Sequence, residues 1–320
     1  MKHLKRINVV LCAILMVAMF ATAAAENDWS SISDRFAEIP NLEYQGKEYK
    51  LRDQLTSVLF MGVDRREHAT DANRTAGGGQ ADFLMLLVID DGRNVITPIM
   101  INRDTMTEIT LIDIYGEESG NYTAQICLSH GFGNGREQSC ELTVRAVSKL
   151  LKNVPIDHYV AMGMDGIAAF NDVIGGVEVT LEDDFTEFDP EMTKGARIKL
   201  KGMQAEYFVR GRYGVGNQTN MYRMHRQRIY LESAKEIILS EIRKSANFVN
   251  TMFDAVEDTL ITDVRRGYLV NLANKIHLYE VKPFTDIAGV SSVGKSGYME
   301  FIPDEDSIIQ TLLDSYYQPV

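Results

Sequence analysis

Short apolar runs that alternate with helical patterns constrain the fold of this chain more than any other feature. The runs at residues 57–63, 83–89, 95–101, 159–164 and 177–181 have turn residues around them and are typical of strands. Helical patterns cover residues 140–151 and the segment from Asp165 to Gly175, and the longest helix candidate spans about 222–248. Strands interleaved with helices of this length predict an α/β sandwich, in which helices cover both faces of one sheet.

The first 50 residues do not share this pattern. Basic residues precede an apolar run at 9–25 that ends in three alanines, so residues 1–25 are predicted to be a signal peptide. An uncleaved N-terminal membrane anchor is the alternative, because the run is close to the length that spans a bilayer. Residues 26–50 are polar and aperiodic, as in a spacer, and 51–320 have no internal linker, which predicts one domain. Either form of the leader predicts export to the outer face of the cytoplasmic membrane or the cell wall.

An arginine-rich segment stands out against the acidic composition of the chain. The formal net charge is -12, yet Tyr207–Tyr230 contains five arginines and no Asp, Glu or Lys. At helical spacing, Arg223, Arg226 and Gln227 share a face with apolar residues, whereas Arg228 points the other way. Inward-facing guanidinium groups need a bound anion or a carboxylate partner, and their fork suits phosphate. A solvated basic helix face is the alternative. The acidic balance argues against nucleic acid as a partner, while one basic patch indicates a localised phosphate ligand.

Three charged clusters lie at the ends of expected strands. They are Asp64 to Arg66, Asp82 at the opening of the next strand, and Asn102 to Asp104. Strand ends that converge are where α/β proteins bind ligands. Because Mg²⁺ takes one or two carboxylates together with substrate phosphate, Asp64 and Asp82 are the candidate metal ligands. Arg103 would neutralise charge on a leaving phosphate. Taken alone, an Asp at a strand end is more often part of a turn or a helix cap, and neighbouring Arg and Asp are more often a structural ion pair.

Two cysteines follow the leader, Cys127 and Cys140. An oxidising compartment permits a disulfide between them, and two separate buried thiols are the alternative.

Taken in order, these segments resemble the LytR-CpsA-Psr family of cell-envelope proteins. The resemblance covers about residues 57–316 and is specific only as an ordered set. The segments that carry it are Phe60-Met61-Gly62-Val63-Asp64-Arg65-Arg66, Ala81-Asp82-Phe83-Leu84-Met85-Leu86, Ile101-Asn102-Arg103-Asp104-Thr105, Pro155-Ile156-Asp157-His158-Tyr159-Val160, Ile174-Gly175-Gly176-Val177-Glu178-Val179, and Val209-Arg210-Gly211-Arg212 followed by Arg223 and Arg226-Gln227.

The resemblance implies a mixed central β-sheet flanked by helices, with an apolar groove for a polyprenyl chain. It also implies a Mg²⁺-dependent phosphotransferase that moves a glycopolymer, such as teichoic acid or capsule, from a polyprenyl-pyrophosphate carrier to a peptidoglycan acceptor at the membrane surface. By similarity, Asp64 and Asp82 hold the metal or activate the acceptor hydroxyl, with Arg103 as the third catalytic residue. The residues that would grip the pyrophosphate are Arg66, Arg103, Arg210, Arg212, Arg223, Arg226 and Gln227.

This chain departs from the family pattern at several positions. Gln80 stands where an arginine is usual, so one phosphate contact is expected to weaken or to come from Arg65 or Arg74. An acidic residue is often found at the position of Asn220, which could simply cap the helix. His130 is expected to be structural.

Two further functions use the same residues. A pyrophosphatase would replace the sugar hydroxyl with water, and a non-catalytic regulator would bind lipid phosphate without turnover. The sequence does not distinguish these from the transferase, and it does not identify the glycopolymer.

Overall fold

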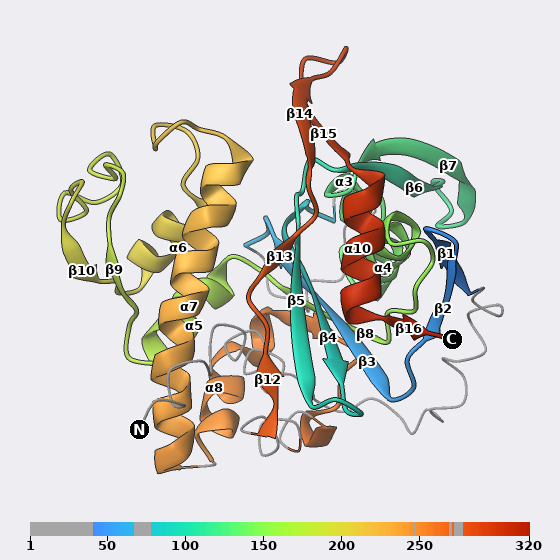
Figure 1. Cartoon of the computed structure of the whole chain (residues 1–320). Coiled ribbons are helices and arrows are strands. Elements are labelled where there is room, and N and C mark those ends of the chain that lie inside the picture. Colours follow the sequence, from blue (N-terminus) through green and yellow to red (C-terminus); the bar gives the residue numbers. More distant parts are fainter. Residues whose placement is uncertain (1–40, 67–77, 246, 269–270, 272–277) are drawn as a thin grey trace.

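A seven-stranded mixed sheet forms the centre of the molecule (Figure 1). The computed structural model describes residues 41–66, 78–245, 247–268, 271 and 278–320. The strand order is β11–β8–β3–β4–β5–β12, and β13 also pairs with β5. The bounds are β3 Leu55–Val63, β4 Ala81–Asp90, β5 Val95–Ile101, β8 His158–Met162, β11 Leu260–Thr262, β12 Glu280–Val281 and β13 Thr285–Asp286. Strand β3 runs parallel to β8 and antiparallel to β4, which is itself antiparallel to β5.

Helices cover both faces of this sheet, as expected (Figure 1). One face packs against α5 (Asp165–Val173), α6 (Met203–Arg210), α7 (Asn220–Lys244) and α8 (Phe248–Val256), and the other packs against α4 (Glu137–Leu150) and α10 (Glu305–Ser315). The short helix α3 (Leu128–Gly131) precedes α4. Side chains alternate between the faces, with Phe60 and Met85 in the first core and Leu59 and Leu86 in the second. A strand buried on both faces reads as a continuous apolar run, which is the pattern that the sequence shows. The predicted α/β class is confirmed.

Several elements differ from the sequence expectations. The expected strand at 177–181 forms as β9 (Glu178–Thr180), but it pairs with β10 (Arg197–Lys199) outside the central sheet. The long helix α7 ends at Lys244, where Ser245 takes an extended conformation. Two hairpins had not been expected. They are β6–β7 (Met106–Ile112, Glu118–Gln125) and β14–β15 (Gly289–Val293, Met299–Pro303), and the second projects from the top of the molecule in Figure 1.

The boundary of the expected spacer at residue 50 is wrong. Residues Leu42–Tyr44 (β1) and Lys47–Leu51 (β2) form a hairpin, and Tyr317–Pro319 (β16) pairs with β2. The folded domain therefore includes residues 42–50, because their backbone groups are paired with the C-terminal strand. The leader at 1–25 and the spacer at 26–40 lie outside the described residues, and those predictions stand untested. None of the helices in the described ranges combines the length and apolar character needed to cross a bilayer.

Candidate functional site

The predicted strand-end clusters meet at one edge of the central sheet. Because β4 is antiparallel to both β3 and β5, the end of β3, the start of β4 and the end of β5 lie together. Asp64 follows β3, Asp82 is the second residue of β4, and Arg103 follows β5. Arg223, near the N-terminus of α7, reaches the same edge. Its guanidinium donates a hydrogen bond to Asp82. The convergence predicted from the sequence is confirmed.

A β-bulge presents Asp82 at this edge. Gly62 pairs with Phe83 and Val63 pairs with Ala81, so Asp82 is the extra residue of β4. Bulges re-aim a side chain and are common beside active sites. Gly62 is required for the close approach of the two strands, because a Cβ atom there would lie 2.9 Å from the Cβ of Phe83. The local backbone therefore turns Asp82 out of the regular alternation.

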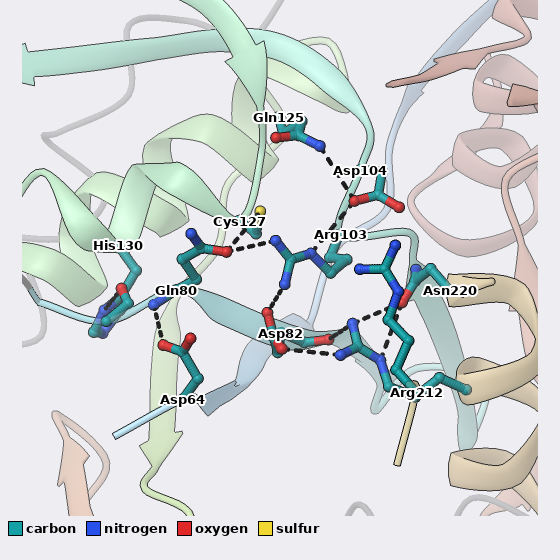
Figure 2. A network of polar contacts seen from close by, with 12 residues as sticks. Asp64, Gln80, Asp82, Arg103, Asp104, Gln125, Cys127, His130, Arg212 and Asn220 are labelled. Carbon is teal, nitrogen blue, oxygen red and sulfur yellow. Dashed lines mark hydrogen bonds and ion pairs between the residues drawn. The ribbon is translucent and has the colours of Figure 1, made fainter. Parts of the chain in front are cut away.

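Two arginines from different elements hold the Asp82 carboxylate (Figure 2). Arg103 donates from Nη1 to Oδ1, and Arg223 donates from Nη1 to Oδ2 at 2.9 Å. Arg223 also donates from Nη2 to the backbone oxygen of Asp82 at 3.3 Å. Hydrogen bonds between charged partners are shorter and stronger than neutral ones, so the three side chains form one rigid unit.

An amide pair supports Arg223 from behind. The side-chain oxygen of Asn220 accepts from Arg223 Nη2 at 2.7 Å and from Nε at 3.2 Å. The Asn220 amide nitrogen donates to Asn102 Oδ1 at 2.7 Å, and that oxygen also accepts the backbone N–H of Asp104 at 3.0 Å. Thr219, not Asn220, is the N-cap of α7, so the capping role considered for Asn220 is wrong. Asn220 is instead a buried link between β5 and the arginine.

Gln80 joins Asp64 to Arg103. Its backbone N–H donates to Asp64 Oδ1 at 2.5 Å, and its side-chain oxygen accepts from Arg103 Nη2 at 2.5 Å (Figure 2). Arg65, which was expected to compensate for the glutamine, turns away and donates to the backbone oxygen of Gly135 at 3.1 Å. Arg74, the other residue considered for that contact, lies in a part of the chain that is not described.

The electrostatics of the site favour an additional anion. Burial and, after it, the neighbouring Arg103 and Arg212 together lower the pKa of Arg223 to about 10, which marks a guanidinium surrounded by like charges. Burial raises the pKa of Asp104 above its usual value, against the opposing effect of Arg103. A phosphate placed among these arginines would relieve their mutual repulsion.

An apolar pocket opens beside Asp82. It encloses about 720 Å³, its open mouth included. Its polar rim contains Asp64, Asp82, Arg210, Arg223 and Gln227, and its apolar lining includes Phe83, Met162, Ile167, Phe170, Val209, Tyr230 and Leu231. A few polar groups on an apolar wall are typical of small-molecule sites. The pocket lies between the sheet and α5, α6 and α7, and its lining is the apolar surface that the structure shows beside Asp82.

A second group of charges stands at the pocket mouth. Arg66 and Arg210 share Glu206 Oε1, at 2.5 and 2.7 Å, and Arg66 also contacts Asp165 Oδ1 at 3.3 Å. Arg66 is therefore held near the pocket wall formed by Arg210. Arg212 lies close enough to Arg223 and Asp104 to shift the pKa of both (Figure 2).

Arg226 is not among the residues that line the pocket, and its expected grip on pyrophosphate stays a prediction. Its guanidinium donates to the backbone oxygens of Phe208 (3.0 Å) and Gly211, contacts Asp183 at 3.4 Å, and stacks over Phe185 at 5.3 Å. Its inward orientation was predicted correctly. Its acceptors were not predicted, because Phe208 and Gly211 lie at the end of α6 and Asp183 lies further back in the chain. Gln227 donates to Val209 O at 3.2 Å and still lines the pocket.

The cysteines and His130 support the site from beneath. Both cysteines are free and buried. Cys127 Sγ lies 3.9 Å from Gln80 Oε1, and Cys140 Sγ lies 4.0 Å from His130 Nε2. The Nδ1 of His130 lies 3.1 Å from the backbone oxygen of Gly79, and burial lowers its pKa to about 4. The structural role expected for His130 agrees with these contacts.

The donor set at the site fits a magnesium ion. Asp64 and Asp82 line the same pocket, and their oxygens are the ligand type that Mg²⁺ takes. Within the described ranges, no group of three or more His, Cys, Asp and Glu side chains could hold a metal ion. Two carboxylates suit a metal that takes its remaining ligands from water and substrate phosphate.

Sequence reasoning missed three residues of this network. Gln80 and Asn220 were noticed only as departures from a pattern, and Asn102 only as a neighbour of Arg103. A neutral amide beside a buried arginine is the signal that could have identified them, since a buried guanidinium needs acceptors whatever their charge.

Fold and site together define an α/β protein with a cationic clamp at the mouth of an apolar pocket. The chain belongs to the LytR_cpsA_psr family, whose sequence profile matches residues 15–312. A relative from Bacillus cereus, named polyisoprenyl-teichoic acid–peptidoglycan teichoic acid transferase TagU, is 28% identical over 233 residues. That match covers 71% of this chain and 66% of the relative, so the chain spans just under two thirds of the relative's length.

Solved structures show the same fold. TagV of B. subtilis superposes with a TM-score of 0.61 at 22% identity, covering 82% of this chain and 98% of TagV. TagT, in a structure described as bound to LI-WTA, gives a TM-score of 0.60 at 19% identity, covering 82% of this chain and 91% of TagT.

Proposed function

We propose that this protein is a phosphotransferase that moves a glycopolymer from a polyprenyl-pyrophosphate carrier to a hydroxyl of peptidoglycan. The observation that carries the proposal is the pair of arginines, Arg103 and Arg223, on opposite oxygens of Asp82 at the rim of an apolar pocket. The rim suits a diphosphate and the pocket suits an isoprenoid tail. The printed name of the B. cereus relative supports teichoic acid as the class of polymer.

When the substrate binds, its diphosphate would accept hydrogen bonds from arginines that donate to carboxylates in this structure. Diphosphate oxygens would accept from Arg103 and Arg223 in place of, or beside, Asp82. Arg210 at the pocket wall and Arg212 above Asp104 would contact the outer oxygens. Because like charges surround Arg223, an anion stabilises the site more than it would stabilise a set of separately paired arginines.

Transfer would then be an in-line displacement at the phosphorus that carries the sugar. The acceptor hydroxyl oxygen forms a bond to that phosphorus, the bond from phosphorus to the bridging oxygen breaks, and polyprenyl phosphate leaves. The hydroxyl proton would pass to the Asp64 oxygen that the N–H of Gln80 does not fix or, when that oxygen holds the metal, to solvent. Arg103 and Arg223 neutralise the charge that develops on the leaving phosphate.

Magnesium is proposed as the cofactor, held by Asp64 and Asp82. When bound there it would neutralise diphosphate charge and orient the phosphate oxygens. We expect chelation with EDTA to stop transfer and added Mg²⁺ to restore it. Full turnover in EDTA would contradict the metal requirement and leave the arginine clamp unaffected.

The decisive experiment measures transfer of a polyprenyl-pyrophosphate-linked oligosaccharide to purified peptidoglycan. Asp82→Ala and Arg103→Ala are expected to abolish transfer while the protein stays folded by circular dichroism. Arg228→Gln is the matched control, because Arg228 lies on α7 but pairs with Asp286 away from the pocket. Normal transfer by either site variant would show that the site is wrong. Phosphate release without an acceptor would indicate a pyrophosphatase, and bound lipid without turnover would indicate a regulator.

Export to the outer face of the cytoplasmic membrane or the cell wall is part of the same proposal. It is supported by the leader pattern at residues 1–25 and by the lipid-linked substrate class. Protease added to intact protoplasts should digest the folded domain, and full protection would contradict export.

A further inference from the structure

Two uncharged amides hold the two arginines that grip Asp82. Gln80 Oε1 accepts from Arg103 Nη2, and Asn220 Oδ1 accepts from Arg223 Nη2 and Nε. Gln80 and Asp82 accept from different terminal nitrogens of Arg103, as Figure 2 shows, whereas Arg223 Nη2 donates both to Asn220 Oδ1 and to the backbone oxygen of Asp82. Each guanidinium therefore contacts a neutral amide as well as Asp82, and Arg103 Nε also lies 3.4 Å from Asp104 Oδ1.

The backbone around Gln80 fixes its side chain. Asp64 N donates to Gln80 O at 3.0 Å and Gln80 N donates to Asp64 Oδ1 at 2.5 Å, so the two residues are bonded in both directions. The next residue, Ala81, donates its N–H to Cys127 O at 3.1 Å. The side chain leaves this fixed segment toward Arg103, and any change in its length or charge acts directly on that guanidinium.

Asn220 is fixed equally well. It is only 4% exposed, and its amide nitrogen donates to Asn102 Oδ1. An aspartate could accept from Arg223 but could not donate to Asn102. Only an amide can serve both neighbours.

Neutrality at these two positions decides the charge of the cluster. In the described part of the chain, Arg103, Arg212 and Arg223 stand near two carboxylates, Asp82 and Asp104. The arginines are thus in excess. A carboxylate in place of either amide would supply the missing negative charge and weaken anion binding in this chain, because Gln80 stands where the family usually has an arginine to offset it.

We propose that Gln80 is a positioning residue for Arg103, and that Gln80 and Asn220 together keep the Asp82 cluster cationic so that it binds a diphosphate. This rests on the proposed function, which supplies the diphosphate. The amides hold the arginines in place without neutralising them.

Calorimetric titration with farnesyl diphosphate tests the role of Gln80. Gln80→Glu keeps an acceptor for Arg103 and adds one charge, and it should weaken binding about 30-fold at low salt. Gln80→Met has a similar length but no acceptor, and it should weaken binding roughly 5-fold. Raising the salt concentration should shrink the deficit of Gln80→Glu and leave that of Gln80→Met unchanged, because only the first arises from added charge.

Asn220→Asp gives the corresponding test on α7. Its matched control is Asn217→Asp, an exposed position where Oδ1 accepts from the N–H and hydroxyl of Thr219 and an aspartate can do the same. We expect Asn220→Asp to weaken farnesyl diphosphate binding at least as much as Gln80→Glu, and Asn217→Asp to change it less than 2-fold.

The outcomes separate this inference from the proposed function. If the wild-type protein binds farnesyl diphosphate and Gln80→Glu binds it equally well, the inference is wrong and the function stands. Equal, salt-independent losses in Gln80→Glu and Gln80→Met would overturn the charge argument. A wild-type protein that does not bind farnesyl diphosphate would overturn the proposed diphosphate site itself.

Discussion

Arg223 and Arg226 stand one turn apart on the inner face of α7, and both are almost fully buried, yet their surroundings differ in kind. Arg226 is saturated by fixed acceptors, two backbone oxygens and Asp183. Arg223 shares Asp82 with Arg103 and has further arginines nearby. Burial lowers the pKa of each, but Asp183 opposes that effect at Arg226, whereas like charges add to it at Arg223. The acceptors of an inward-facing arginine thus decide its role. We call Arg226 an anchor, because fixed protein acceptors use its hydrogen bonds, and Arg103 and Arg223 the clamp, because they share one carboxylate and are available to a phosphate.

The largest effect is expected at the clamp. Arg223→Gln should lower kcat for transfer roughly 10³-fold, since it removes a donor aimed at the developing charge. Its stability should change little, because relief from the like charges of Arg103 and Arg212 offsets the lost ion pair. Single-turnover kinetics and thermal unfolding of the same preparation measure both quantities. If the variant is destabilised and its kcat is unaltered, Arg223 is an anchor like Arg226 and the proposed difference between the two arginines is wrong.

Arg226→Gln should show the reverse. Removal of the guanidinium leaves Asp183 and two carbonyl oxygens without their donor, at a cost of about 3 kcal/mol in the free energy of unfolding. The KM and kcat of the folded fraction should match the wild type. Urea denaturation gives the free energy, and kinetics at low temperature give the constants. If kcat falls while the urea midpoint stays unchanged, Arg226 belongs to the clamp after all.

The pocket provides a third comparison, between the diphosphate group and the isoprenoid tail of farnesyl diphosphate. Ile167 belongs to the apolar lining of the pocket, so Ile167→Trp should fill the apolar space. Binding of farnesyl diphosphate should weaken roughly 10-fold through lost apolar burial, and binding of inorganic pyrophosphate should not change. Calorimetry with the two ligands makes the measurement. Equal losses for both would mean that the pocket does not hold the tail.

The smallest effect is expected at the pocket mouth. The Arg66 side chain is 49% exposed and shares Glu206 with Arg210, so its charge is screened by solvent and partly redundant. Arg66→Gln should raise KM only about 3-fold. A loss as large as that of Arg223→Gln would place Arg66 within the clamp.

The sequence predicted what depends on local pattern. Long apolar runs located β3, β4, β5 and β8, and the spacing of Arg223 and Arg226 gave their inward orientation. The three charged clusters converged because strand direction alone brings their ends together. Their residue types then indicated phosphate.

What the sequence did not predict depends on partners distant in the chain. The hairpins β6–β7 and β14–β15 lack a long apolar run, and β7 is largely exposed and contains Gly120. Two acceptors of Arg226 are backbone oxygens, which every residue carries, so they cannot be predicted from residue type. The residue types of Gln80 and Asn220 do not indicate their roles either, because each role depends on the arginine that the fold places beside the amide.

The pairing of β16 with β2 has a consequence for how the chain matures. Residues 317–319 complete a sheet that begins at residue 42, so the hairpin β1–β2 keeps one unpaired edge until residues 317–319 have been synthesised. An open strand edge is a template for wrong pairing, and closure across so long a loop is slow. A nascent or truncated chain that lacks Tyr317–Pro319 would therefore be the form most exposed to aggregation and to quality-control proteases.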